Sequence, residues 1–236
     1  MAVYTTTPRA GEVDPEALMS FVFRAVDEVG AALNAALVVM GDQLGYYRAL
    51  AEHGPFDAPA LARLTGTDEH YAREWLHAQA AGGYIDHDAA SGQFTISLEH
   101  AVALTDETSP AYLRSLFQIA HGTIRDTPEI LDAARTGSGY GWHEHNADVH
   151  VGCERFFRPS YLAHLTTDWL PALDGVVPRL EQGAPVLDVG CGHGASTVLM
   201  AQAYSASSFL GTDYHRESID VARERAAAAG VAGNTE

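Results

Sequence analysis

A glycine-rich run late in the sequence, Asp188–Ser196, reads DVGCGHGAS and limits the possible folds of the segment around it. It follows a short apolar run typical of a strand, Val186–Val189, and leads into a helical pattern over Ala195–Tyr204. Three glycines at such a junction let the backbone turn tightly and approach a ligand closely. A second strand over Ser208–Thr212 and a second helix over Ser218–Ala229 follow. This order predicts the beginning of a doubly wound α/β domain.

An acid, Asp213, closes the second predicted strand, 25 positions after Asp188. At the carboxyl end of that strand its carboxylate can accept hydrogen bonds from both ribose hydroxyls of a nucleoside cofactor. The pattern acid-x-Gly-x-Gly-x-Gly, with a later acid after the second strand, resembles motif I of the class I S-adenosylmethionine-dependent methyltransferases. The resemblance implies S-adenosyl-L-methionine as cofactor. The cofactor-binding residues that it implies are Asp188, Gly190, Cys191, Gly192, Gly194, Asp213 and Tyr214.

The resemblance also implies a role for each of these positions. The first acid and the backbone of Gly190 and Gly192 would face the methionine moiety, and Gly194 would permit close helix packing. The second acid would hold the ribose, and Tyr214 would lie along the adenine face. Cys191 occupies a variable motif position, so we expect a small packed residue beside the ligand rather than a nucleophile.

A nicotinamide-binding turn is the competing interpretation of the same residues. Gly190, Gly192 and Ala195 also satisfy G-x-G-x-x-A, with the later acid as the ribose ligand. Asp188, however, places a carboxylate where dinucleotide folds carry an apolar residue facing the pyrophosphate. A carboxylate repels a diphosphate but attracts the ammonium and sulfonium of S-adenosylmethionine. Gly194 also completes the methyltransferase pattern, which is therefore favoured.

Upstream, the apolar positions predict a long amphipathic helix from Pro15 to Met40 and a second helix through Tyr46–Ala51. The apolar face of the long helix would consist of Leu18, Phe21, Val22, Ala25, Val26, Val29, Leu33, Leu37 and Met40. A third helix begins at Asp57-Ala58-Pro59. The third helix, the turn after it and the next helix together form a helix-turn-helix pattern.

The fourth predicted helix is capped by Thr67, and Tyr71, Trp75 and Ala78 form its buried stripe before Gly82 ends it. A hairpin follows, in which Phe94, Ile96 and Leu98 alternate. Helix, helix, turn, helix and hairpin is the order of a winged helix-turn-helix. It resembles the dimerisation module of small-molecule and plant-type O-methyltransferases, which implies a homodimer and a small-molecule acceptor.

A nucleic-acid reader would need cations on its recognition helix and wing. The helix from Thr67 to Gly82 carries three acids and one arginine, and the hairpin adds Asp86 and Asp88 without a base. The whole chain has a formal net charge of −17. We therefore expect neither a nucleic-acid nor an anionic-membrane partner and interpret the module as a packing and dimerisation unit.

Between the two units we expect helices opening at Ser109-Pro110, at Thr127-Pro128 and after Pro159. The donors in Trp142-His143-Glu144-His145, with His150 and Cys153, match no zinc spacing, so no metal site is predicted. One hypothesis is that Tyr140–Arg158 folds over the cofactor mouth. Arg155 and Arg158 are candidates for anchoring a carboxylate, with surface ion pairs as the plainer alternative.

The predicted fold class is multidomain α/β, a mainly α winged-helix domain followed by an incomplete Rossmann-like methyltransferase domain. The expected ranges are a tail over 1–15, the winged-helix domain over 16–104, linker helices and a loop over 105–182, and the Rossmann-like start over 183–236. Two distant cysteines and the absence of a signal-peptide pattern predict a cytoplasmic protein.

The predicted function is methyl transfer from S-adenosylmethionine to a small molecule, with no catalytic base that the sequence identifies. The alternatives are a non-catalytic winged-helix regulator or inactive fragment, and an NAD(P)-dependent oxidoreductase. Two strands and two helices cannot bury both faces of a parallel sheet, and a complete domain needs on the order of 100 more residues. We therefore expect the sequence to be part of a longer protein or a damaged gene product.

Overall fold

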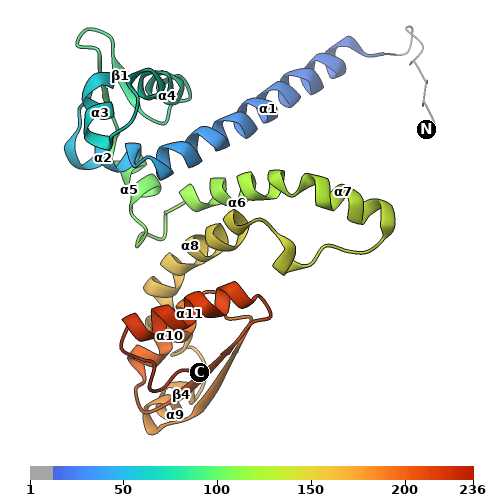
Figure 1. Ribbon diagram of the computed structural model, residues 1–236, viewed down its shortest axis with the longest axis vertical. Helices are drawn as coiled ribbons and strands as arrows, with labels where there is room; N and C mark the ends of the chain where they lie inside the picture. The colour runs from blue at the N-terminus through green and yellow to red at the C-terminus, as the bar shows by residue number, and fades with distance from the viewer. Residues whose placement is uncertain (1–12) are drawn as a thin grey trace.

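The computed structural model describes residues 13–236, so most of the predicted tail over 1–15 lies outside the described residues. Figure 1 shows three parts: a winged-helix unit from which one long helix projects, a middle group of helices, and a small α/β unit. The first part contains α1 (Pro15–Gln43), α2 (Tyr46–His53), α3 (Ala58–Thr65), α4 (Glu69–Ala81), β1 (Asp86–Asp88), β2 (Gln93–Thr95) and α5 (Leu98–Thr105). The middle part contains α6 (Arg114–Arg125), α7 (Thr127–Thr136), η1 (Trp142–Glu144), α8 (Ala147–His164) and η2 (Leu165–Trp169). The third part contains α9 (Val176–Gln182), β3 (Pro185–Val189), α10 (Ala195–Ala203), β4 (Ser208–Thr212) and α11 (Arg216–Ala228). No helix in the described range has the length and apolar character that crossing a membrane requires.

The long helix α1 confirms the predicted helix from Pro15. Asp14 caps it by accepting the N–H of Glu16 (2.9 Å), and Pro15 occupies the first turn, where its missing N–H costs no hydrogen bond. Only the end of its apolar face is buried, around Ala35 and Val38. The other apolar side chains of the predicted face are 38–68% exposed: Leu18, Phe21, Val22, Val26, Val29 and Leu33.

The core of the winged-helix unit forms around Trp75, whose ring lies 4.9 Å from the rings of both Tyr46 and Tyr47. The indole Nε1 donates to the carbonyl of Leu37 in α1 (2.8 Å). Gly41 permits this approach, because a Cβ there would lie 2.3 Å from the Trp75 ring. The C-terminal end of α1 is therefore part of the winged-helix core.

Two predictions for α4 are wrong. Tyr71 is 66% exposed, because the inward face is centred between Trp75 and Leu76, roughly a quarter turn away around the helix. Asp68, rather than Thr67, caps α4 by accepting the N–H of His70 (2.9 Å). The Thr67 hydroxyl instead accepts a hydrogen bond from Tyr46 (2.8 Å) and so links α2 to the turn.

The hairpin is confirmed, with His87 opposite Phe94 in an antiparallel pair. Phe94 is buried in the winged-helix core, and Ile96 packs against it. Leu98 is not part of this alternation: it begins α5 and is 76% exposed. The reason is the Ser97 hydroxyl, which accepts the N–H of His100 (3.2 Å) and caps a helix where the strand pattern would continue.

The middle helices differ most from expectation. The first begins at Arg114 rather than at Ser109-Pro110, which forms a turn, whereas α7 begins at Thr127 as predicted. The helix expected after Pro159 begins at Ala147, where Asn146 caps it, and continues through the proline. Residues 147–158, which precede the predicted helix start, therefore form the first part of α8.

Close packing against α6 explains why α8 is helical there. A Cβ on Gly122 of α6 would lie 2.9 Å from Val149, and a Cβ on Gly152 of α8 would lie 2.7 Å from Ile119. The two glycines let the helix axes approach, and tertiary packing stabilises a helix whose own sequence is polar.

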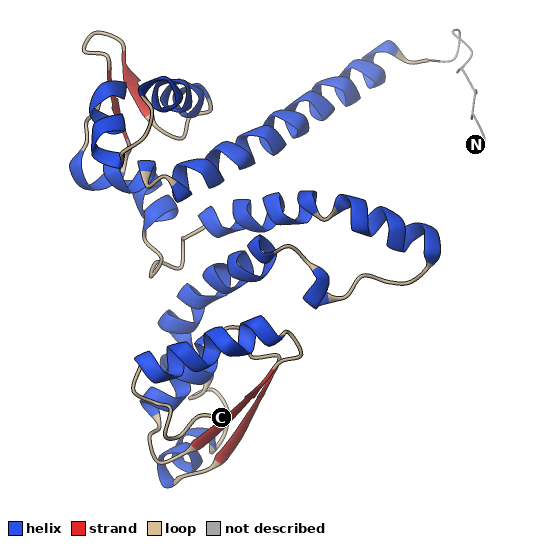
Figure 2. Ribbon diagram, in the orientation of Figure 1, coloured by secondary structure: helices blue, strands red, loops and turns tan. Residues whose placement is uncertain are grey.

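The α/β unit confirms the predicted strand–helix–strand–helix order. Figure 2 shows β3 and β4 side by side, and they are parallel. In their register Leu187 lies opposite Leu210. Phe209 of β4 also donates its N–H to Asn234 (2.9 Å) and accepts from Glu236 (2.9 Å). Residues 234–236 thus pair with the outer edge of β4, a third strand position that the sequence did not reveal. The carboxyl ends of β3 and β4 point toward α8, and the site lies there.

Candidate functional site

A cavity of about 640 Å³ lies between the carboxyl ends of β3 and β4 and the helix α8. The glycine-rich loop forms its floor, and α8 and the segment around Trp142 form the facing wall. Its lining residues are Trp142, His150, Cys153, Glu154, Phe157, Tyr161, Asp188, Val189, Gly190, Cys191, Gly192, His193, Ala195, Ser196, Asp213, Tyr214 and Ser218. This position is where open parallel sheets bind their ligands.

The cavity brings together six of the seven predicted cofactor-binding residues: Asp188, Gly190, Cys191, Gly192, Asp213 and Tyr214. Gly194 lies outside it, and a Cβ there would be 2.8 Å from the Cβ of Ala222 on α11. This glycine therefore lets α10 approach α11 closely. The binding of a cofactor by these residues stays a prediction.

Most backbone N–H groups of the glycine-rich loop donate hydrogen bonds to acceptors of the protein itself. Gly190 and Cys191 both donate to the carbonyl of Thr212 (2.7 and 3.1 Å), and Gly194 donates to Cys191 (2.9 Å). Gly190, Gly192 and Gly194 all have positive φ values of 75°, 52° and 72°, which favour glycine. The loop is thereby fastened to the end of β4, with few donors directed at the cavity.

Asp213 stands at the end of β4 with its carboxylate held by backbone. Its Oδ2 accepts the N–H of Gly192 (3.0 Å), and its Oδ1 accepts the N–H of His215 (2.8 Å). Each oxygen has a second lone pair. The carboxylate is therefore oriented before any ligand binds and keeps acceptor capacity on the cavity side.

Asp188 lies at the end of β3 and is tied to the first turn of α10. Its Oδ2 accepts hydrogen bonds from the hydroxyls of Ser196 (2.8 Å) and Thr197 (2.6 Å). The sequence pattern did not indicate these two hydroxyl partners. They fix the carboxylate at the cavity floor without neutralising its charge.

The hypothesis about Tyr140–Arg158 placed part of this segment over the cofactor mouth, but the helical wall that α8 forms as far as Tyr161 was not predicted. Cys153, Phe157 and Tyr161 line the cavity at intervals of four residues, which is one face of a helix. The spacing of four residues indicates one helix face, but a proline usually begins or interrupts a helix, so the helix was predicted to begin after Pro159. Burial raises the pKa of Tyr161, and the nearby Asp188 carboxylate raises it further.

Burial, followed by the charges of Asp188 and Asp213, raises the pKa of the Cys191 thiol to about 11. The thiol is therefore protonated at neutral pH, which agrees with a packed side chain rather than a nucleophile. Burial and the nearby Arg225 charge lower the pKa of His193 below its ordinary value, so its imidazole is neutral at pH 7.

The segment hypothesised to cover the cofactor mouth contributes aromatic rings to the cavity. The ring of His143 lies 5.4 Å from that of Tyr214, and the ring of His150 lies 4.0 Å from that of His215. The carbonyl oxygen of Trp142 accepts a hydrogen bond from Nε2 of His150 (2.8 Å). Within residues 13–236 no three His, Cys, Asp or Glu side chains converge as a metal site would require.

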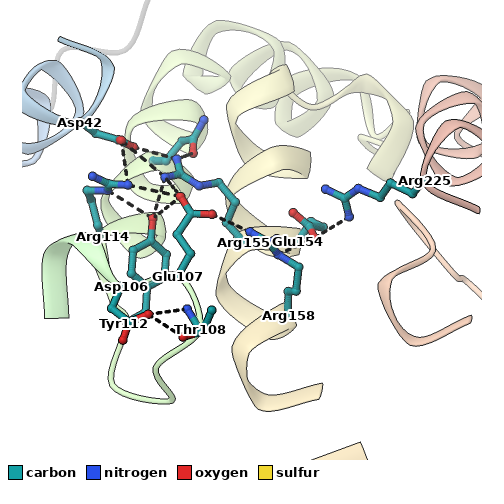
Figure 3. Close-up of polar contacts among 11 residues, drawn as sticks. Asp42, Asp106, Glu107, Thr108, Tyr112, Arg114, Glu154, Arg155, Arg158 and Arg225 are labelled. Atoms are coloured by element: carbon teal, nitrogen blue, oxygen red, sulfur yellow. Dashed lines mark hydrogen bonds and ion pairs between the residues drawn. The ribbon is translucent and has the colours of Figure 1, made fainter. Parts of the chain in front are cut away.

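Arg155 and Arg158 do not line the cavity. Arg155 pairs with Asp42 and Glu107 (2.7 Å each), and Arg158 pairs with Glu107 (2.5 Å). The suggestion that they anchor a ligand carboxylate is therefore wrong for this structure, because both guanidinium groups already have protein carboxylates. Figure 3 shows them within a network that joins α1, α6 and α8.

Comparisons with known proteins identify two matched domains and a shared fold. Residues 31–106 match the model of the Rv2258c-like winged HTH domain, and residues 180–236 match a methyltransferase domain model. No curated protein sequence matches the chain.

Three solved structures illustrate the similarity in fold. Mitomycin 7-O-methyltransferase is 20% identical, with a TM-score of 0.65 over 94% of this chain and 66% of that one. An O-methyltransferase family protein from Burkholderia thailandensis is 18% identical (TM-score 0.61, 91% and 63%). Human N-acetylserotonin methyltransferase, solved with S-adenosylmethionine, is 17% identical (TM-score 0.59, 92% and 64%).

The chain thus spans somewhat less than two thirds of the length of these structures. At these identities the likeness establishes the fold alone, and the two matched domain models agree with it. Residues 31–106 therefore match a winged helix-turn-helix domain, residues 180–236 match a methyltransferase domain, and the chain shares the fold of these solved methyltransferases.

Proposed function

We propose that the chain binds S-adenosyl-L-methionine in the cavity at the strand ends and serves the transfer of its methyl group to a small-molecule acceptor. The observation that carries this proposal is the charge of the cavity. Its lining contains the carboxylates Glu154, Asp188 and Asp213 and neither arginine nor lysine. Glu154 is paired with Arg158 and Arg225, whereas within residues 13–236 Asp188 and Asp213 accept only hydroxyl and backbone donors. Such a cavity attracts a ligand that carries a sulfonium and an ammonium group.

The hydrogen bonds of the loop favour this ligand over a dinucleotide. A pyrophosphate needs free backbone N–H groups at a glycine-rich turn. Here the N–H groups of Gly190, Cys191, Gly192 and Gly194 are donated to protein acceptors. A nicotinamide dinucleotide would therefore meet two carboxylates and few donors.

The roles proposed for the residues follow from their positions. Asp213 would accept the ribose hydroxyls, and Tyr214 would lie along the adenine. Asp188 and the backbone of Gly190 and Gly192 would face the methionine part. The cofactor supplies a methyl group activated by the sulfonium. The protein would orient it, and the rings of the α8 wall would exclude water from the cavity.

Binding measured by calorimetry tests the proposal. The chain should bind S-adenosylhomocysteine and should not bind NAD⁺ under the same buffer and salt. Binding of NAD⁺ alone would replace the proposal with an oxidoreductase. Absence of binding for both, with an intact fold, would leave a non-catalytic dimerisation module.

We propose in addition that the chain forms a homodimer through α1. Leu18, Val22 and Val29 belong to the exposed apolar row of this helix, and such a row rarely remains in water. A second copy that covers the row would bury it. Val29→Asp should therefore shift the mass in sedimentation equilibrium from that of two chains toward that of one, whereas Asp27→Ala on the same helix should not. A monomeric unmodified chain would contradict the dimer.

A further inference from the structure

Glu154 and Arg225 form an ion pair at the edge of the cavity, between helices that are far apart in sequence. The Glu154 side chain is only 8% exposed, and its Oε1 lies 2.5 Å from Nη1 of Arg225 on α11. The same Nη1 lies 3.4 Å from the carbonyl oxygen of His193 in the glycine-rich loop. One guanidinium therefore joins α8, α11 and the loop.

The helix α8 is itself anchored on its other side. Arg155, next to Glu154, pairs with Asp42 of α1 (2.7 Å), and Arg158 lies between Glu107 (2.5 Å) and Glu154 (3.2 Å). Figure 3 shows these contacts running from Asp42 through α8 to Arg225. Glu154 therefore belongs to a helix, α8, that is anchored to α1, and its side chain extends toward the glycine-rich loop.

The other hydrogen bonds of the glycine-rich loop do not hold its α8 side, where Arg225 makes the contact. The N–H groups of Gly190, Cys191 and Gly192 fasten the loop to Thr212 and Asp213, on the β4 side. Among the polar contacts of residues 13–236, the one from Arg225 to the carbonyl of His193 links the loop to the residue that pairs with α8. Glu154 already faces two guanidinium groups, so its charge is compensated by the protein rather than available for a ligand.

We propose that Glu154 and Arg225 are positioning residues for the proposed cofactor site: the pair sets the separation between the glycine-rich loop and the α8 wall. This inference rests on the proposed function. A shift of the loop changes the shape of the whole cavity, so the pair should affect every ligand that binds on the loop, including one without an amino-acid part.

The test compares two ligands by calorimetry, S-adenosylhomocysteine and 5′-methylthioadenosine, which lacks the amino-acid part. Glu154→Gln and Arg225→Gln should each weaken both ligands by about tenfold. The double variant should be no weaker than the weaker single one, because the two residues act through each other. Arg225→Lys keeps the charge and should restore most of the affinity.

The matched control is Arg223→Gln, on the same helix, because Arg223 pairs with Asp220 in an exposed contact (75% and 62% exposed). This variant should bind both ligands as the unmodified chain does. Melting curves of all variants show whether each one is folded.

Three results would overturn the inference: unchanged affinities in folded Glu154→Gln and Arg225→Gln, a loss confined to S-adenosylhomocysteine, or no recovery in Arg225→Lys. A loss confined to that ligand would mean direct recognition of its amino-acid part. If the unmodified chain binds neither ligand, the proposed function fails and this inference with it. Binding by the unmodified chain separates the two cases.

Discussion

Replacement of Asp213 by alanine is the most direct test of the cofactor site. The carboxylate oxygens accept the N–H groups of Gly192 and His215, and one lone pair on each oxygen remains for a ribose hydroxyl. Asp213→Ala removes both acceptors. Two charge-assisted hydrogen bonds in a half-open cavity contribute about 1–3 kcal/mol together, after competition from water. The dissociation constant for S-adenosylhomocysteine should therefore rise by about 5-fold to 150-fold.

The assay is titration calorimetry at a fixed salt concentration, since charge interactions weaken with ionic strength. Asp220→Ala on α11 is the control, because Asp220 is exposed and pairs only with Arg223 along its own helix. The control separates a local contact from a general loss of negative charge. An Asp213→Ala variant that melts normally and binds S-adenosylhomocysteine as tightly as the unmodified chain would refute the ribose role. An equal loss in the Asp220→Ala control would refute the local explanation.

Three further predictions concern stability and reactivity. Gly194→Val should lower the free energy of unfolding by about 1–3 kcal/mol in urea titrations, because φ is 72° and a Cβ at this position would meet Ala222. Gly30→Ala, with open space around it, should be neutral or stabilising. Equal effects of the two variants would contradict the packing argument. Burial lowers the pKa of His193 in the folded chain, so the unfolded chain binds more protons and stability should fall as pH drops below about 6.5. His193→Gln should lose less stability over that window, and identical pH profiles would disprove this. Because the pKa of Cys191 is about 11, iodoacetamide at pH 8 should label it far more slowly than in urea-unfolded protein, and equal rates would show that the thiol is not shielded.

Much of the α/β unit could be predicted because its signals are local. A strand, a turn and a helix follow one another within Asp188–Ser196, and positive φ values there require glycine whatever lies around them. The strand bounds of β4 agree with the prediction for the same reason. The order of the winged-helix elements was also readable, since caps and turns such as Asp57 and Gly66 depend on neighbouring residues.

The predictions were wrong where the spacing of a side chain was compatible with either burial or exposure. Tyr71 and Leu98 are apolar and well spaced, but one lies beyond the edge of the inward face of α4 and the other follows a cap. The apolar row of α1 was predicted as a face, yet no periodicity states whether the protein itself or a second chain covers it. Burial depends on how the elements pack, and the spacing of residues only limits which side chains can lie on the same face.

The glycine-rich turn, its two acids and the order of the elements on either side could be predicted from the sequence, because they depend on backbone conformations within a few residues. That α8 forms the opposite wall of the cavity follows only from the way the helices pack. That wall depends on the close approach of α6 and α8 at Gly122 and Gly152. It also depends on an ion pair between Glu154 and Arg225, which are 71 positions apart. Such contacts form when whole helices pack, and no local pattern specifies which residues then meet.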